Sequence, residues 1–296
     1  YTEATTGQLI DPNTKDWDYE LIDMLGFPRR IFQEVHKPGT VLGNLKPEIA
    51  AEVGFDLEVM QIGSHDTASA VLAVPANDDD FMYISSGTWS LMGVESKEAN
   101  CSMESRAANF TNEGGYNYRF RFLKNIMGLW MIQSVRHETG DAYSFAQICD
   151  MAEEAKDFPS RVDCNDNCFL APKNMTEEVK DYCRRTNQQV PETLGELATV
   201  IYASLAECYA KTIHEMEAIT GRTYGRIHVV GGGANAGYLN QLTANACSRP
   251  VYAGPTEATA IGNLTAQMLK AKEFTAVEEA RDNIFKSFGV KEYKPE

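Results

Sequence analysis

The chain has 296 residues, of which 43% are hydrophobic and 10% aromatic, a composition that suits a globular protein with a large core. Its formal net charge is −15 and no Lys/Arg run is longer than a pair, which argues against non-specific binding to nucleic acid or to an anionic membrane. No apolar stretch approaches the about 20 residues that a membrane-spanning helix needs.

The start of the chain and its cysteines indicate the compartment. The first residue is Tyr1 and no signal-peptide pattern follows, so we expect a piece of a longer, cytoplasmic protein. The seven cysteines are odd in number and irregularly spaced, which favours reduced thiols over disulfides. Cys164, Cys168 and Cys183 lack the paired spacing and the fourth ligand of a zinc site. We predict no metal site and assign these three cysteines no role.

The first half of the chain alternates turn signals with short elements. Residues 1–58 predict short helical pieces such as "DYELIDMLG", and residues 58–62 a strand that leads to a helix opening near Asp66. Residues 81–86 and 89–96 predict a hairpin, with Gly87 at positive φ in its turn. Alternating aromatic residues predict one strand over 112–125, and Asn125 is the expected N-cap of the next helix.

The second half alternates strands and helices. Residues 150–192 are acidic and turn-rich and receive no assignment. Apolar residues at three- and four-residue steps predict a long helix over 192–221, which Gly221 ends. A strand over 226–230, a glycine loop, a helix over 238–247, a strand at 250–254 and a helix from about Thr256 follow. This alternation predicts an α/β domain with helices on both faces of the sheet.

The run Ser64-His65-Asp66 raises the first question of chemistry. Adjacent side chains on a turn diverge, so these three do not form a Ser-His-Asp triad, whose members must meet in space. The run also lacks the G-x-S-x-G pattern of a nucleophile elbow. Asp66 is then either a carboxylate that only stabilises the start of a helix, or one that the same helix keeps ionised as a proton acceptor in a cleft.

Two glycine-containing turns are candidate phosphate or nucleotide sites. The Gly87-Thr88 hairpin exposes N–H groups and a hydroxyl, which suits a phosphate, although most such hairpins are plain turns. The loop "GGGANAG" at 231–237 lies between a strand and a helix, where a nucleotide can approach the backbone. Its G-x-G-x-x-x-G spacing is neither the Rossmann fingerprint nor a Walker A loop, and a purely structural role stays open.

The order of these pieces resembles that of a known family. Strand–Gly-x-x-Asp–helix, a Gly-Thr hairpin, a GGG loop and then G-P-x-E-A-T-A-x-G-N follow one another as in the FGGY carbohydrate kinases of the actin-like ATPase superfamily. The segments "HDTASA", "SSGTWSLMG", "NEGG", "RFLKNIMGLW" and "GPTEAT" are most similar to the L-rhamnulose kinases of that family. The resemblance runs from Tyr1 to at least Gln267.

The resemblance implies a fold and a domain division. It implies an actin-like (ribonuclease H-like) ATPase domain at residues 63–296, with a mixed sheet and helices on both faces. Residues 1–62 would be the end of a truncated N-terminal domain of the same type. The rest of that N-terminal domain would be a partner of this chain, and without it the fragment would be inactive.

The resemblance also implies a reaction and a set of site residues. ATP, with Mg²⁺, would phosphorylate L-rhamnulose at its 1-hydroxyl, and Asp66 would be the catalytic base. The implied sugar contacts are His65, Asp66, Thr67 and Asn125, and the implied nucleotide contacts are Thr88, Gln133, Gly232 and Gly233.

Other functions stay open at this stage. The chain could belong to a kinase for a different ketose, or to an actin-like ATP-binding module that phosphorylates no sugar. A sugar-facing His65 and Asn125 argue against a pure ATP switch. A Rossmann dehydrogenase is disfavoured by the glycine spacing of the 231–237 loop. The oligomeric state is left open.

Overall fold

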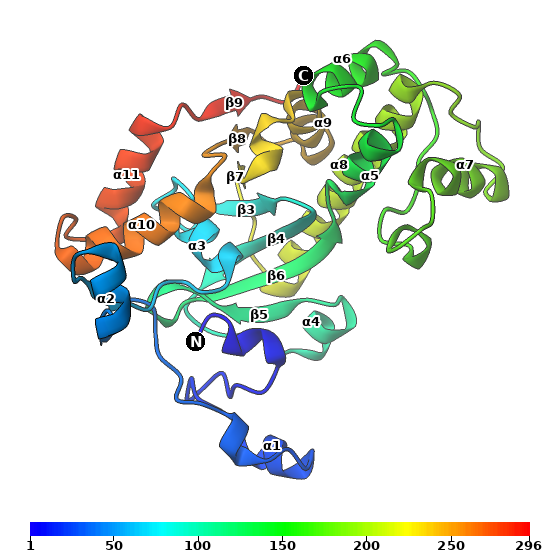
Figure 1. Ribbon diagram of the computed structural model, residues 1–296. Coiled ribbons are helices and arrows are strands. Elements are labelled where there is room, and N and C mark those ends of the chain that lie inside the picture. The colour runs from blue at the N-terminus through cyan, green and yellow to red at the C-terminus, as the bar shows by residue number, and fades with distance from the viewer.

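The computed structural model describes residues 1–296 and is built around a seven-stranded mixed sheet (Figure 1). The strand order is β5-β6-β4-β3-β7-β8-β9. Strands β3, β7 and β8 run parallel, and the other neighbouring pairs are antiparallel. Their bounds are β3 Phe81–Ser86, β4 Trp89–Ser96, β5 Thr111–Gly114, β6 Phe120–Met127, β7 Arg226–Val230, β8 Val251–Ala253 and β9 Lys291–Tyr293.

Helices cover both faces of this sheet, as predicted. Alternate residues of β3 point to opposite faces, so Met82 and Ile84 join the larger core under α8, whereas Phe81 and Tyr83 join a smaller core with α3, α10 and α11. The helices of the smaller core are α3 Asp66–Leu72, α10 Ala258–Ala271 and α11 Val277–Ser287, and those of the larger are α5 Trp130–Glu138, α6 Phe145–Glu154, α7 Met175–Arg185, α8 Leu194–Thr220 and α9 Gly237–Cys247.

The long helix α8 forms where its periodicity predicts it. Thr193 is the N-cap and forms a capping box with Glu196, which satisfies N–H groups at the helix start. Gly221 ends the helix in the left-handed region, with φ 66°. None of the helices in the structure is both long and apolar enough to cross a bilayer.

The first 62 residues form small elements outside the large sheet, as Figure 1 shows for α1 and α2. The strand predicted at 58–62 pairs with β1 in a separate two-stranded sheet rather than joining the seven-stranded one. The elements are η1 Ala4–Gly7, α1 Tyr19–Met24, η2 Arg29–Ile31, β1 Val41–Asn44, α2 Pro47–Val53 and β2 Glu58–Met60.

The prediction that Asn125 caps a helix is wrong. Asn125 lies inside β6, opposite Leu91 of β4, and the ladder continues to the pair Trp89–Met127. The helix α5 begins only at Trp130. The chain turns at Gly128, where a Cβ would lie 2.5 Å from the carbonyl carbon of Trp89. The strand pairing therefore extends past the polar residue that resembled a cap.

Two further expectations for this region are corrected. Residues 112–125 are not one strand, because β5 and β6 are separated by a tight turn, η3 Tyr116–Tyr118, in which Asn117 and Tyr118 have φ of 54° and 58°. Gly87 is not among the residues with positive φ. The stretch without assignment contains the end of α6, η4 Asn167–Phe169 and the whole of α7, whose N-cap is Asn174. A short helix, α4 Met103–Ala107, precedes β5.

Candidate active site

The start of α3 uses both His65 and Asp66. His65 is the N-cap, and its Nδ1 accepts a hydrogen bond from the Thr67 N–H at 3.2 Å. Asp66 is the first residue of the helix, and its Oδ1 accepts from the same N–H at 2.6 Å and from the Thr67 hydroxyl at 3.3 Å. The hydrogen bonds expected at the start of a helix are thus present. On Asp66 they occupy Oδ1 alone, and its side chain is 78% exposed.

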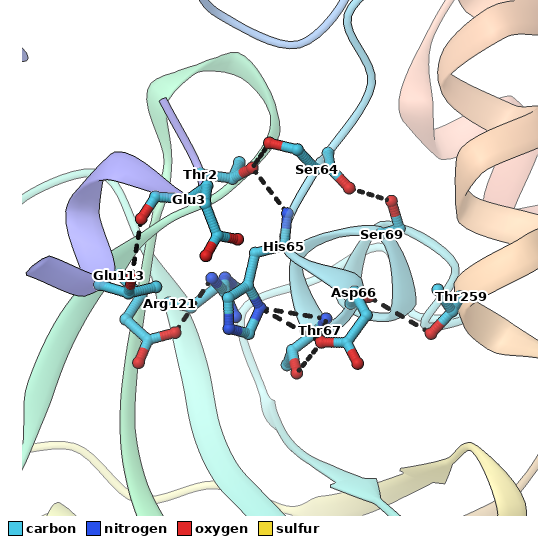
Figure 2. A network of polar contacts seen from close by, with 12 residues as sticks. Thr2, Glu3, Ser64, His65, Asp66, Thr67, Ser69, Glu113, Arg121 and Thr259 are labelled. Atoms are coloured by element: carbon cyan, nitrogen blue, oxygen red, sulfur yellow. Dashed lines mark hydrogen bonds and ion pairs between the residues drawn. The ribbon is translucent and has the colours of Figure 1, made fainter. Parts of the chain in front are cut away.

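Ser64 does not belong to a catalytic triad. Its hydroxyl hydrogen-bonds the hydroxyl of Thr2 at 3.2 Å, and the Thr2 oxygen also accepts from the backbone N–H of His65 at 3.2 Å (Figure 2). Only His65 and Asp66 approach each other, with 3.4 Å between Nδ1 and Oδ1. The expectation that the three form no triad is confirmed, although His65 and Asp66 do not diverge, and Ser64 ties the chain to the N-terminal segment.

Helix α3 is held against α10 and the preceding loop. The Ser69 hydroxyl donates to the Gly63 carbonyl at 2.7 Å, and the Thr259 hydroxyl of the α10 segment donates to the Asp66 carbonyl at 3.3 Å (Figure 2). A Cβ on Gly262 would lie 1.8 Å from the Ser69 carbonyl oxygen. The two helix backbones therefore touch, and this contact sets the position of Asp66.

An open cavity of about 570 Å³ brings several of the predicted residues together. Its walls come from α3, the β3–β4 hairpin, β5, β6 and η1. His65, Asp66, Thr67, Thr88 and Asn125 line it. The carboxylate that could accept a proton and the hydroxyl that could contact a phosphate thus face one space. The remaining lining residues are Thr6, Ser85, Gly87, Trp89, Leu91 and Glu113.

Gln133 is connected to this cavity by a hydrogen bond to Thr88, which lines it. The first turn of α5 docks on the hairpin, because the N–H of Leu129 donates to the Gly87 carbonyl and the N–H of Trp130 to the Thr88 carbonyl, both at 3.0 Å. This places the Gln133 side chain so that its Oε1 accepts from the Thr88 hydroxyl at 3.4 Å. Gln133 does not line the cavity itself.

The glycine loop lies beside the same hairpin. A Cβ on Gly233 would lie 2.0 Å from the Ser86 Oγ, so the loop packs directly on the end of β3. Gly231 has φ 84° and also approaches the Ser86 carbonyl, which requires glycine there. Gly232 is exposed and has open space above it. Gly232 and Gly233 do not line the cavity, and Gly233 packs on Ser86, next to the Gly87-Thr88 turn.

A second cavity of about 570 Å³ adjoins the first, and Thr6, Glu113 and Asn125 line both. Sequence reasoning missed Glu113, Thr6 and Trp89 as site residues. Glu113 belongs to the "NEGG" segment that carried part of the resemblance, which was its only signal. Thr6 lies in η1, far from Glu113 in sequence, and no local pattern links the two.

No group of three or more His, Cys, Asp or Glu side chains in the structure is arranged to hold a metal ion. All seven cysteines are free. Burial raises the pKa of Cys168 to about 11 and that of Cys247 to about 12, so both are thiols at neutral pH.

Comparison with known proteins identifies the family. The model of the FGGY family of carbohydrate kinases, C-terminal domain, matches residues 82–271, and that of the N-terminal domain matches residues 1–73. The chain belongs to the FGGY family of carbohydrate kinases. It is 50% identical over 293 residues to a rhamnulokinase of Halalkalibacterium halodurans and 44% identical over 297 residues to one of Bacillus subtilis.

These matches cover nearly all of this chain but only part of each relative. They cover 99% of this chain but 62% and 61% of the two relatives, so the chain spans about three-fifths of their length. Among solved structures, the xylulose kinase from Rhodospirillum rubrum aligns at TM-score 0.70 and 16% identity over 98% of this chain and 58% of that one. The Plasmodium falciparum glycerol kinase with ADP aligns at 0.72 and 12%, over 97% and 57%. This FGGY chain has the actin-like ATPase fold.

Proposed function

We propose that this chain supplies the catalytic base and nucleotide site of an enzyme that phosphorylates L-rhamnulose at its 1-hydroxyl with ATP. The observation that carries the proposal is that Asp66 and Thr88 line one cavity. The choice of sugar rests on the relatives, which are named rhamnulokinase at 40–50% identity.

Asp66 is the base in this proposal. As the 1-hydroxyl oxygen attacks the γ-phosphorus of ATP in line, its proton passes to the Asp66 carboxylate; the bond from the γ-phosphorus to the bridging oxygen breaks, and ADP leaves. Phosphoryl transfer depends mostly on positioning and charge stabilisation, so a base adds a factor of about 10²–10⁴. Because Oδ1 is occupied by Thr67, Oδ2 is the oxygen left to take the proton.

The other predicted residues divide between the two substrates. His65, Thr67 and Asn125 share the cavity with Asp66 and offer hydrogen bonds to the sugar. The exposed Thr88 hydroxyl, held near Gln133, would contact ATP phosphate. The Gly232–Gly233 backbone would support the nucleotide, since Gly232 leaves open space there. Mg²⁺ would enter bound to the ATP phosphates, whose charge it neutralises.

We further propose a domain boundary near residue 62. Residues 1–62 form their own small elements, whereas α3 packs on the large sheet, although the N-terminal family model extends to residue 73. Large apolar side chains are exposed on this first segment, among them Met24 at 74%, Phe55 at 59% and Ile31 at 52%. The rest of an N-terminal domain would cover them.

The test uses this chain joined to the part of the H. halodurans relative that the alignment leaves uncovered, termed the completed kinase below. ADP production is followed with a panel of ketoses, and the product is identified. We expect turnover with L-rhamnulose and a fall in kcat of about 10²–10⁴ in Asp66→Asn. The matched control is Asp166→Asn, because Asp166 also caps a helical turn but lies outside the cavity.

Two results would contradict the proposal. If ATP binds but no ketose is phosphorylated, the chain belongs to an ATP-binding module. If Asp66→Asn and Asp166→Asn have the same small effect on kcat, Asp66 acts only at the start of its helix.

A further inference from the structure

Glu113 lies where the two cavities meet. It lines both of them, together with Thr6 and Asn125, whereas Asp66 and Thr88 line only the first. A sugar with its reacting hydroxyl at Asp66 therefore has room to extend toward Glu113 and beyond it. The Glu113 side chain is only 9% exposed, so it is a nearly buried carboxylate that faces a site rather than bulk water.

The negative charge of Glu113 is balanced by a buried arginine. Oε2 lies 3.1 Å from Nη2 of Arg121, directly opposite on β6, whose side chain is completely buried (Figure 2). The Arg121 Nε donates to the Gly114 carbonyl at 3.0 Å, which fixes the guanidinium. Arg121 thus forms an ion pair with Glu113 without lining either cavity.

The hydrogen-bonding capacity of Glu113 is unused within the chain. Oε2 makes the ion pair but no hydrogen bond of good geometry, and no side chain or backbone group donates to Oε1. A carboxylate offers about four acceptor sites, and buried polar groups are normally hydrogen-bonded. Oε2 is itself buried, so Oε1 is the oxygen that a donor in the cavity can reach.

We propose that Glu113 determines sugar specificity by accepting hydrogen bonds from the hydroxyls remote from the phosphorylated end. This inference rests on the function proposed above and names a residue that the proposal leaves without a role. A neutral polyol supplies the donors that a carboxylate needs, whereas a second phosphate at that end would be repelled. Arg121 acts as a positioning residue that holds Glu113.

This arrangement should make the site selective for sugars that carry these hydroxyls. A site built to hydrogen-bond a substrate hydroxyl rejects an analogue that lacks it, because the buried acceptor is then left unpaired. Ketoses that lack one of these remote hydroxyls should therefore be poor substrates of the parent enzyme, and removing the Glu113 charge should reduce that discrimination.

The test compares Glu113→Gln with the parent in the completed kinase. We expect the sugar KM to rise about 10- to 100-fold, as for loss of hydrogen bonds to a charged group, while the KM for ATP stays within about twofold. Discrimination against 4-deoxy and 5-deoxy ketoses should fall by about the same factor. The matched control is Glu95→Gln, because Glu95 forms an equally buried pair with Arg281 at 2.7 Å but lines neither cavity.

The control separates recognition from folding. Both variants leave a buried arginine without its partner, so both should lower the melting temperature, but only Glu113→Gln should raise the sugar KM. If Glu113→Gln does not fold, the double variant Glu113→Gln/Arg121→Gln removes both charges and should show the same rise in sugar KM.

The outcomes distinguish this inference from the proposed function. A folded Glu113→Gln enzyme with unchanged sugar KM and unchanged discrimination overturns the role of Glu113 and leaves the kinase function standing. Sugar KM values that rise equally in Glu113→Gln and Glu95→Gln also overturn it. A parent enzyme that phosphorylates no sugar overturns both.

Discussion

Thr88 shows how a residue can be free for a ligand because the fold does not use it. Its side chain is exposed on the β3–β4 turn, and its hydroxyl makes only a long 3.4 Å hydrogen bond to Gln133. Its backbone carbonyl, in contrast, accepts from the Trp130 N–H at 3.0 Å and holds α5. The backbone of Thr88 is structural, and its hydroxyl is available to a phosphate.

Thr88→Val should therefore weaken ATP binding without unfolding the protein. The variant keeps the shape of the side chain and removes the hydroxyl, so we expect the KM for ATP to rise about 10- to 100-fold, the cost of one hydrogen bond to a charged group. Steady-state kinetics of the completed kinase at saturating sugar would measure it. Thr88→Ser, which keeps the hydroxyl, should stay close to the parent. Equal KM values for ATP in the Val and Ser variants would remove Thr88 from the nucleotide site.

At the scale of elements, the contact between α3 and α10 decides where Asp66 lies. Helices that approach this closely need a small residue at the crossing point, and Gly262 provides it against the Ser69 backbone. The Thr259 hydroxyl adds a hydrogen bond to the Asp66 carbonyl, one turn earlier on α10. Helix α3 is thus positioned by the segment "GPTEATAIGN", which lies almost 200 residues later in the chain.

Gly262→Ala should push the two helices apart. Its Cβ would lie 1.8 Å from the Ser69 carbonyl oxygen, a backbone atom that cannot rotate away. We expect a loss of about 1–3 kcal/mol in the free energy of unfolding, as for other overpacked cores. Urea denaturation of the chain measures it. Gly7→Ala, where a Cβ would meet nothing within 4 Å, is the control. If both substitutions cost the same, the close helix contact is not present in solution.

Which elements were predictable depends on how local their signals are. The period of α8, the glycine that ends it and the β3–β4 hairpin each depend on residues that are close together in the sequence, and all were predicted correctly. The extension of β6 through Asn125 was not, because it depends on pairing with β4 some 30 residues earlier. Glu113 was missed for the same reason: its burial opposite Arg121 is a property of the paired strands.

At the scale of the whole molecule, the site exists only because distant segments converge. Residues of η1, α3, the β3–β4 hairpin, β5 and β6 line one cavity, and the glycine loop after β7 packs on Ser86 at the end of β3. The family resemblance supplied the residue types, and the structure shows that five of the predicted side chains share that space. Local sequence patterns alone left Asp66 equally explicable as a helix-start residue. The stability of the central sheet is therefore a condition for the site.

His228 couples that stability to pH. It lies on β7, inside the seven-stranded sheet, is 2% exposed, and stacks on Tyr252 with ring centroids 5.2 Å apart. Burial lowers its pKa from 6.5 to about 3, with a further contribution from the nearby charge of Arg226. Below about pH 6.5 the unfolded chain therefore binds a proton at this residue that the folded protein does not bind, until the pH reaches about 3.

The free energy of unfolding should consequently fall as the pH is lowered through this window. The contribution of His228 is fully present above its unfolded pKa and should decline by about 3 kcal/mol between about pH 7 and about pH 4. His228→Phe keeps an aromatic ring between Phe81 and Tyr252 and cannot be protonated. The free energy of unfolding of this variant should therefore fall by about 3 kcal/mol less than that of the parent over the same pH range. Urea unfolding of both proteins at several pH values measures the difference, and carboxylates common to both cancel. His137→Gln, at a side chain that is 84% exposed, should follow the parent. Parallel pH profiles for the parent and His228→Phe would mean that the folded sheet admits the protonated imidazole, and β7 would then have to be open enough to hydrate it.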